Sequence, residues 1–79
     1  SSSDPQALML QNADKRLLDR ALETLPLEFR EILIMRELED LSYKEISTVA
    51  DIPLGTVMSR LARARKMLRA SLERIMQEK

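Results

Sequence analysis

The sequence predicts an all-α domain of four helices that ends in a helix-turn-helix. Its 79 residues include one Gly and three Pro, and helix-forming Leu, Ala, Glu, Arg and Met dominate the rest. Apolar residues recur every three or four positions along most of the chain, as on one face of a helix. A short capped segment is followed, after a turn of about four residues, by a long basic segment, which is the layout of a helix-turn-helix.

The folded domain is expected to span residues 12–79, and residues 1–11 to be a linker or a remnant of protein production with a possible helical extension. Leu8 and Leu10 can belong to that extension, and Asn12 or Asp14 can begin the well-formed first helix. This helix ends at Leu25, because the residue before a proline avoids the α region. Its apolar residues form one stripe: Leu18, Ala21, Leu22 and Leu25.

The second helix is expected from Pro26 to Glu39, with a break at Asp40 and Leu41. Proline suits the first turn of a helix, and Glu28 suits the positive end of its dipole. The segment is expected to bury a broad apolar face made of Phe29, Ile32, Leu33, Met35 and Leu38.

The third helix is short and begins with a capping box, Ser42 to Glu45, in which Ser caps the helix and Glu follows three residues later. It is expected to run to about Asp51 and to need a neighbour, because helices of this length are marginal in water. Its expected buried residues are Ile46, Val49 and Ala50. A break follows at residues 52–55, where Gly55 is expected to serve a turn.

The last helix is expected to begin at Pro53 or Thr56 and to reach at least Arg74. Its core stripe is Val57, Leu61, Ala64, Leu68, Leu72 and Ile75. The opposite face carries Ser59, Ala62, Arg63 and Lys66, with Met58 and Arg69 beside them. Arg60 and Arg65 flank the stripe, where they can meet DNA phosphates or pair with acids such as Glu45.

The net charge of zero conceals a strong asymmetry along the chain. Residues 1–51 contain 11 acids and 6 bases, whereas residues 52–79 contain 7 bases and 2 acids. A local field of this kind survives a neutral total, because salt screens charges over about 8–10 Å. The basic end indicates an anionic partner such as duplex DNA, and the alternative is a solvated helix face.

Several function classes are excluded by composition. The chain has neither Cys nor His, so the common zinc sites and most nucleophile–base pairs cannot be built. We therefore expect no enzyme, no catalytic residue, no metal and no cofactor. The only aromatic residues are Phe29 and Tyr43, too few for stacking on single strands. Without a long apolar run or signal peptide, we expect no membrane insertion and a cytoplasmic location.

A second contact is predicted at the start of the third helix, at Ser42, Tyr43 and Lys44. Unpaired backbone N–H groups and the helix dipole favour an anion there, such as a DNA phosphate. The plainer interpretation is that Ser42 only caps the helix and Tyr43 only packs.

Two motifs carry a family resemblance: Leu-Ser-Tyr-Lys-Glu-Ile at 41–46 and Gly-Thr-Val-Met-Ser-Arg-Leu-Ala-Arg-Ala-Arg at 55–65. Together with Leu25-Pro26 and Arg30, they resemble region 4 of bacterial sigma factors, above all the extracytoplasmic-function group. The resemblance covers about Asp14 to Leu72 and implies a winged-helix-like region 4 fold without a wing. It also implies recognition of the upstream (−35) promoter element and docking on the β-subunit flap of core RNA polymerase. An anti-sigma factor is a further implied partner, and the chain would be the C-terminal domain of a longer factor.

The resemblance assigns the family's DNA contacts to Ser59, Arg63 and the helix start near Thr56. It also implies that Arg36 and Tyr43 approach the DNA backbone. Two positions depart from the family. Met58 stands where Arg or Lys is common, and Ala62 where a larger side chain is common, so each loses reach or charge, although both can touch thymine methyls. The full expected DNA-binding set is Arg36, Ser42, Tyr43, Lys44, Thr56, Met58, Ser59, Arg60, Ala62, Arg63 and Lys66.

Two rival binding modules stay open. One is a sigma mimic that binds an anti-sigma factor without reading DNA, and the other is a quorum-sensing-type response-regulator domain. A salt titration distinguishes the sigma mimic, because DNA binding should weaken steeply as salt rises. The response-regulator domain differs in the motif of its recognition helix. The apolar residues beyond the needs of a small core are Met9, Leu10, Met35, Met67 and Met76. Some of these are expected to line a groove for the polymerase flap or an anti-sigma helix.

Overall fold

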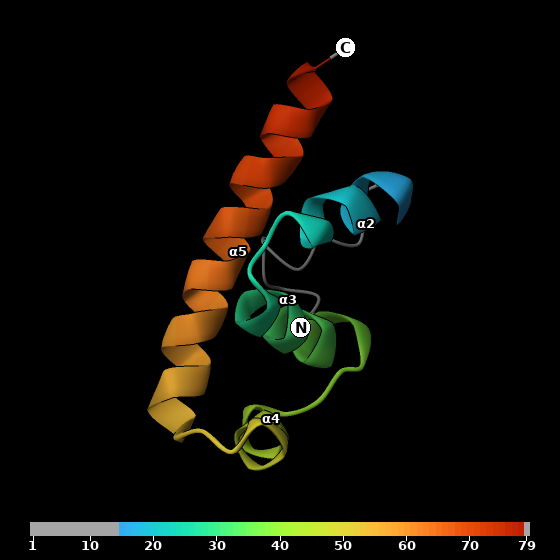
Figure 1. Cartoon of the computed structure of the whole chain (residues 1–79). Coiled ribbons are helices and arrows are strands. Elements are labelled where there is room, and N and C mark those ends of the chain that lie inside the picture. The colour runs from blue at the N-terminus through green and yellow to red at the C-terminus, as the bar shows by residue number, and fades with distance from the viewer. Residues whose placement is uncertain (1–14, 79) are drawn as a thin grey trace.

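The computed structural model describes residues 15–78 and shows four helical segments with no strand in that range (Figure 1). They are α2 (Lys15–Glu23), α3 (Leu27–Leu33) continuing into the π-helical η1 (Ile34–Leu38), α4 (Tyr43–Ala50) and α5 (Leu54–Gln77). The all-α prediction with a C-terminal helix-turn-helix is confirmed. The expected extension through Leu8 and Leu10, and a helix start at Asn12 or Asp14, lie outside the described residues.

The long helix α5 is the element on which the other helices pack. In Figure 1, α2, α3 and α4 follow one another along one side of α5, and each of them packs on it. In the same view α4 is seen almost end-on while α5 runs along the page, so their axes are strongly inclined. The loop at residues 51–53 joins the two helices, and it places α4 against the first turns of α5.

The hydrophobic core lies between α5 and the other three helices. All six residues of the predicted α5 stripe are buried, which confirms the helical period: Val57, Leu61, Ala64, Leu68, Leu72 and Ile75. They meet buried side chains from every other helix and from the turn after α2: Ala21, Leu22, Leu25, Phe29, Ile32, Leu33 and Ile46. Leu18, at the edge of α2, is half-buried against the same cluster.

A polar contact ties the end of α2 to the second half of α5. The Thr24 hydroxyl donates to the carbonyl oxygen of Ala21 over 2.6 Å. Its oxygen also lies 2.8 Å from the hydroxyl of Ser71, so Ser71 acts as the donor of that bond. Ser71 is only 2% exposed, and this bond satisfies a polar group that would be costly to bury alone.

The second helix departs from the predicted pattern in its last turn. The Glu39 N–H donates to the carbonyl oxygen of Ile34 over 2.9 Å, a step of five residues instead of the four of an α-helix. This wider turn moves the following side chains out of the α-helical register. The prediction that Leu38 is buried is therefore wrong, since Leu38 is 59% exposed, whereas Met35 remains half-buried.

The third helix packs through one side chain. Ile46 is fully buried, Ala50 is half-buried, and Val49 is 67% exposed. The prediction that Val49 is buried is wrong, because α4 turns only one side towards α5 and η1. Val49 instead lines an open hollow beside α3 and η1.

The turns around α4 are made by aspartates and a proline. Asp40 and Asp51 both adopt the left-handed conformation with φ 58°, which Asp tolerates better than most residues. Pro53 follows with an extended ψ of 152° and precedes the first residue of α5. Gly55 lies inside α5 and has no positive φ, so the prediction that it serves a turn is wrong. A Cβ placed on Gly55 would meet nothing within 4 Å.

Candidate nucleic-acid interface

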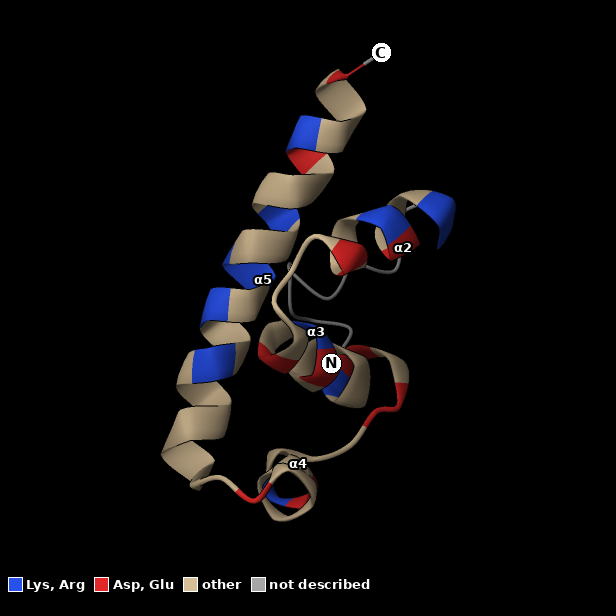
Figure 2. Ribbon diagram, viewed as in Figure 1, with Lys and Arg blue, Asp and Glu red and all other residues tan. Residues whose placement is uncertain are grey.

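Between residues 58 and 66, α5 turns five side chains to solvent, and we call them the outer face: Met58, Ser59, Ala62, Arg63 and Lys66. The buried stripe on the other side of the helix holds it against the domain. Figure 2 shows Lys and Arg in bands along α5, whereas its first turns carry none. The helix therefore has the two faces that its sequence period predicts, one apolar and buried, the other exposed and partly basic.

Hydrogen bonding limits what Ser59 can offer at this face. Its hydroxyl donates to the carbonyl oxygen of Thr56 over 3.3 Å, so in this conformation its oxygen is left as an acceptor. Arg63 is exposed and Thr56 is half-buried. Both line a shallow hollow of about 300 Å³ between α5 and the beginning of α3, where Glu28 lies. The strongest exposed hydrogen-bond donors of the outer face are thus Arg63 and Lys66.

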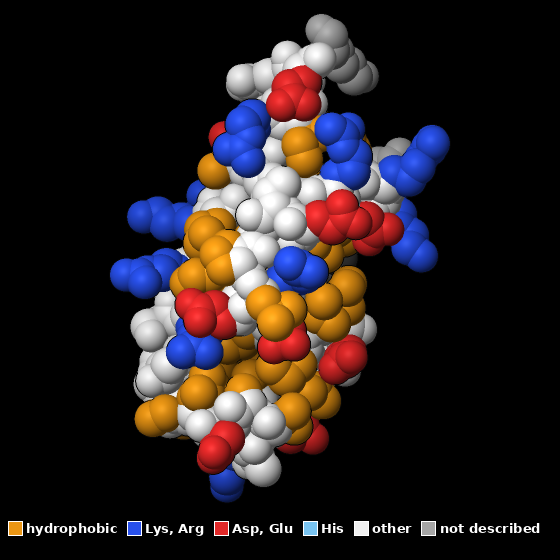
Figure 3. Space-filling view, viewed as in Figure 1, with side chains coloured by type: hydrophobic (Ala, Val, Ile, Leu, Met, Phe, Trp, Pro, Cys, Tyr) orange, Lys and Arg blue, Asp and Glu red, His pale blue; other side chains and the backbone are white. Residues whose placement is uncertain are grey.

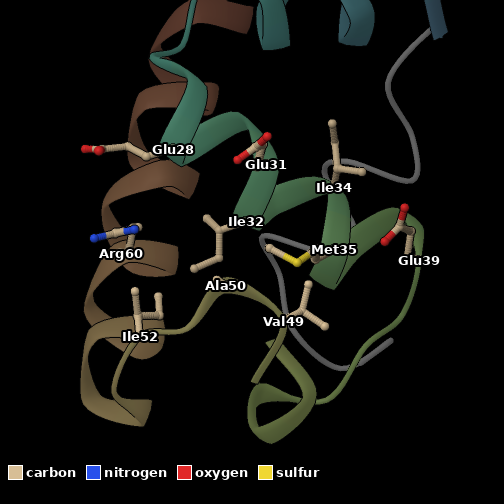
Figure 4. A pocket seen from close by; sticks show the side chains of 10 residues that line it. All are labelled: Glu28, Glu31, Ile32, Ile34, Met35, Glu39, Val49, Ala50, Ile52 and Arg60. Atoms are coloured by element: carbon tan, nitrogen blue, oxygen red, sulfur yellow. The ribbon is translucent and has the colours of Figure 1, made fainter. Parts of the chain in front are cut away.

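The two arginines beside the core stripe have different surroundings. Arg65 is paired with Glu37 of η1, at 2.6 Å between Nη2 and Oε2. The expected pairing of Arg65 with an acid is therefore confirmed, but the acid is Glu37 and not the suggested Glu45, which is engaged in the cap of α4. Arg60 is half-buried and extends outward in the same direction as Glu28 (Figure 4). Glu37 as the partner of Arg65 left no signal in the sequence, because the two residues are 28 positions apart.

The capping box at the start of α4 is present as predicted. The Glu45 N–H donates to Ser42 Oγ over 3.0 Å, and the Ser42 N–H donates to Glu45 Oε1 over 2.8 Å. The backbone N–H of Ser42, then its side chain, lowers the pKa of the Glu45 carboxyl below the usual 4.5. The N–H groups of Tyr43 and Lys44 belong to the first turn of α4, and Lys44 is exposed.

Arg36 and Tyr43 form one cluster beside this cap. The Arg36 guanidinium lies over the Tyr43 ring, 5.0 Å from its centroid, and its Nη1 donates to the carbonyl oxygen of Leu41 over 2.8 Å. Tyr43 is half-buried and packs against the core. The predicted site residues thus form two groups, one around the start of α4 and one on the first half of α5.

A larger hollow of about 540 Å³ opens between α3, η1 and α4. Ile32, Met35 and Val49 turn towards it in Figure 4, and Glu31 and Glu39 lie at its rim. Figure 3 shows apolar side chains gathered over the lower half of this face, with acidic side chains among them. Met35 lines this hollow, as the expected Met-lined groove requires, whereas Val49, which was expected in the core, lines the hollow instead.

None of the helices over residues 15–78 combines the length and the apolar character that crossing a bilayer requires. Within the same range, no cluster of three or more acidic side chains is placed to hold a metal ion.

Comparison with known proteins places α2, α3, η1, α4 and the first part of α5 in one family. The pattern described as "Sigma-70, region 4" matches residues 15–68, more than half of the chain. The "ECF RNA polymerase sigma-E factor" of Escherichia coli (strain K12) is 42% identical over 66 residues, which cover 84% of this chain and 35% of that protein. The protein of the same name from Salmonella typhimurium (strain LT2) matches equally.

A second named relative is the "RNA polymerase sigma-H factor" of Pseudomonas aeruginosa, 36% identical over 74 residues, or 94% of this chain and 38% of that protein. The chain therefore spans little more than a third of the length of these curated relatives. Because the family pattern runs from the first described helix through the middle of α5, this chain belongs to the sigma-70 region 4 family.

Proposed function

We propose that this chain works in bacterial transcription initiation as the sigma-factor domain that recognises the −35 promoter element and docks on core RNA polymerase. The observation that carries the proposal is the division of α5 into two faces. Its apolar stripe is buried in the domain, and its outer face presents Arg63 and Lys66 to solvent. The relatives, named as RNA polymerase sigma factors, support the same function.

Readout of DNA bases belongs to the outer face in this proposal. A major groove about 12 Å wide admits an α-helix. Arg63 can form a bidentate contact with a guanine, worth about 1–3 kcal/mol of base discrimination. Lys66, further along the helix, suits a phosphate as a mobile point charge. The proposed α5 contacts are Thr56, Met58, Ser59, Arg60, Ala62, Arg63 and Lys66.

Positioning on the DNA backbone belongs to the start of α4. The N–H groups of Tyr43 and Lys44 and the positive helix end favour a phosphate, and the ammonium of Lys44 adds charge. Ser42 and Arg36 contribute by fixing this turn, through the cap and through the contact with Leu41. These four residues hold the register of the duplex without reading its sequence.

The docking surface for protein partners is, in this proposal, the 540 Å³ hollow between α3, η1 and α4. Met35, Val49 and Ile52 offer adaptable apolar contacts to a helix such as one from the β-subunit flap. An anti-sigma factor would inhibit the domain by covering the same hollow or the outer face of α5. All these partners would act in the bacterial cytoplasm.

The test is a footprint made with core RNA polymerase. Residues 15–78 replace the matching segment of the Escherichia coli sigma-E factor, and protection of the upstream promoter DNA is compared between this chimera and its Arg63→Ala variant. We expect Arg63→Ala to lose upstream protection, because the guanidinium leaves the groove. Arg74→Ala, an exposed arginine at the far end of α5, should keep it. Equal footprints for the two variants would contradict the role of Arg63, and absence of protection in the chimera would favour a sigma mimic.

A further inference from the structure

Three apolar residues follow one another on the exposed surface of α5, and we call them the apolar row: Leu54, Met58 and Ala62. Each lies four residues from the next, so they are neighbours on the helix surface. Leu54 is 48% exposed, Met58 is 54% exposed, and Ala62 is also exposed. The apolar row is thus a strip of apolar surface that the fold leaves open to water.

The apolar row does not serve the core. The buried stripe of α5 lies on another side of the helix and is complete without it. Single exposed apolar residues are common and need no explanation. Here, however, Met58 and Ala62 of the row form one flank of the outer face, and Ser59 and Arg63 form the other. A single partner that covers the outer face would therefore contact both flanks.

The chemistry of the groove indicates what the apolar row would contact. Of the four bases, only thymine presents a methyl group in the major groove, and apolar side chains read it. Met58 has no hydrogen-bonding group to offer a base edge except a weak sulfur acceptor, and Ala62 has none. Their side chains therefore discriminate by apolar contact, whereas Arg63 discriminates by hydrogen bonds.

We propose that the apolar row makes this domain a thymine reader, with Met58 and Ala62 each seated on a thymine 5-methyl group. The inference rests on the proposed function, since it requires α5 to enter the major groove. The two residues are about 6 Å apart along the helix axis, on the order of two base-pair steps of 3.4 Å. The thymines read by the row would accordingly lie close together, next to the base read by Arg63.

The positive charges beside the apolar row favour duplex DNA as its binding partner. No acidic residue occurs from Ile52 to Leu72, and Arg63 and Lys66 lie beside the row. A polyanion is therefore attracted to this side of α5, and it would bring its bases against Met58 and Ala62. An apolar protein partner would have to cover these charges as well, which costs free energy unless it supplies acids.

The experiment uses the 79-residue chain and the replacement of thymine by deoxyuridine, which removes only the methyl group. Preferred duplexes are first selected from a random pool at micromolar protein and low salt. Each thymine of the preferred site is then replaced singly by deoxyuridine, and the Kd is measured. We expect about a fourfold weaker Kd at each thymine that touches the row.

Variants assign the effect to a residue. Met58→Ala should abolish the response to deoxyuridine at one thymine and leave the response at a neighbouring thymine. Met76→Ala is the matched control, because Met76 is 58% exposed on the last turns of the same helix. It should leave every response unchanged. Thermal unfolding of the variants confirms that they fold, and the comparison of thymine with deoxyuridine needs no variant at all.

Two results would overturn the inference. If a preferred site is selected and weakened by Arg63→Ala, but no deoxyuridine changes the Kd, the domain reads DNA without the methyl contact and the proposed function stands. If the pool yields no preferred site, both the inference and the proposed function fail.

Discussion

Arg65 of α5 and Glu37 of η1 form an ion pair with two hydrogen bonds, on the side of α5 that faces the rest of the domain. Arg65 Nε and Nη2 both donate to Glu37 Oε2, over 3.1 Å and 2.6 Å. The two side chains are only 13% and 10% exposed. The pair therefore fixes α5 against the wide turn that leads to α4. Arg65 thus acts inside the domain, although it stands in a run of basic residues.

Breaking this pair should destabilise the domain strongly. Arg65→Met leaves the Glu37 carboxylate nearly buried without its partner, and we expect the free energy of unfolding to fall by about 3 kcal/mol. Urea unfolding followed by circular dichroism measures it. Arg63→Met is the matched control, since Arg63 is exposed, and it should change stability by no more than about 0.5 kcal/mol. Equal effects of the two substitutions would show that the pair does not hold α5 in place.

The attachment of α4 should depend on one side chain. Ile46 is the buried residue of α4 and is 0% exposed. Ile46→Ala removes it from the core and should lower the free energy of unfolding by about 3 kcal/mol. Val49→Ala, three residues later, should have little effect because Val49 is 67% exposed. Chemical denaturation of both variants measures these free energies of unfolding. A larger decrease for Val49→Ala than for Ile46→Ala would refute this packing.

The cap of α4 should give the domain a defined acid dependence. The pKa of Glu45 is lowered in the folded state, mainly by the Ser42 backbone N–H, so the charged form stabilises folding. That contribution is complete above the unfolded pKa near 4.5 and disappears as the pH falls through the lower folded pKa. The gap in unfolding free energy between wild type and Glu45→Gln should therefore be constant near neutral pH and narrow in acid. A gap that does not change with pH would show that the carboxylate charge has no part in the cap.

Lys66 and Arg63 should differ in the kind of DNA binding they support. Lys66→Ala would remove the proposed phosphate contact, so binding should weaken about equally for all sequences, and the slope of log K against log salt should become smaller by about 0.9. Arg63→Ala would remove the proposed base contact, so it should relax the preference at one position of the site. Salt titrations on preferred and random duplexes measure both effects. If the two variants behave alike, the outer face of α5 does not separate base readout from charge.

The sequence was most informative about α5 and the cap of α4, because both signals are local. The six-residue stripe and the box from Ser42 to Glu45 are each defined by spacing within one helix. Contacts between distant segments left no such signal. Glu37 and Arg65 are 28 residues apart, and only the packing of η1 on α5 brings them together.

The positions of Leu38 and Val49 show a second limit of sequence patterns. Apolar spacing says which residues share a helix face, but it does not say whether a neighbour covers that face. The wide turn after Ile34 moves Leu38 out of register, and the hollow beside α4 leaves Val49 exposed. The DNA-contacting roles of the site residues likewise depend on a partner, so they stay predictions.

The most direct test of the account is a map of the DNA-binding face by NMR. The 79-residue chain, labelled with ¹⁵N, is titrated with a preferred duplex, and shifts of backbone amides are followed. We predict that the largest shifts occur at Ser42–Lys44 and over residues 54–66, whereas α2 and the last turns of α5 remain unchanged. Shifts centred on α2 or on the C-terminal turns of α5 would contradict the claim that the outer face of α5 meets DNA.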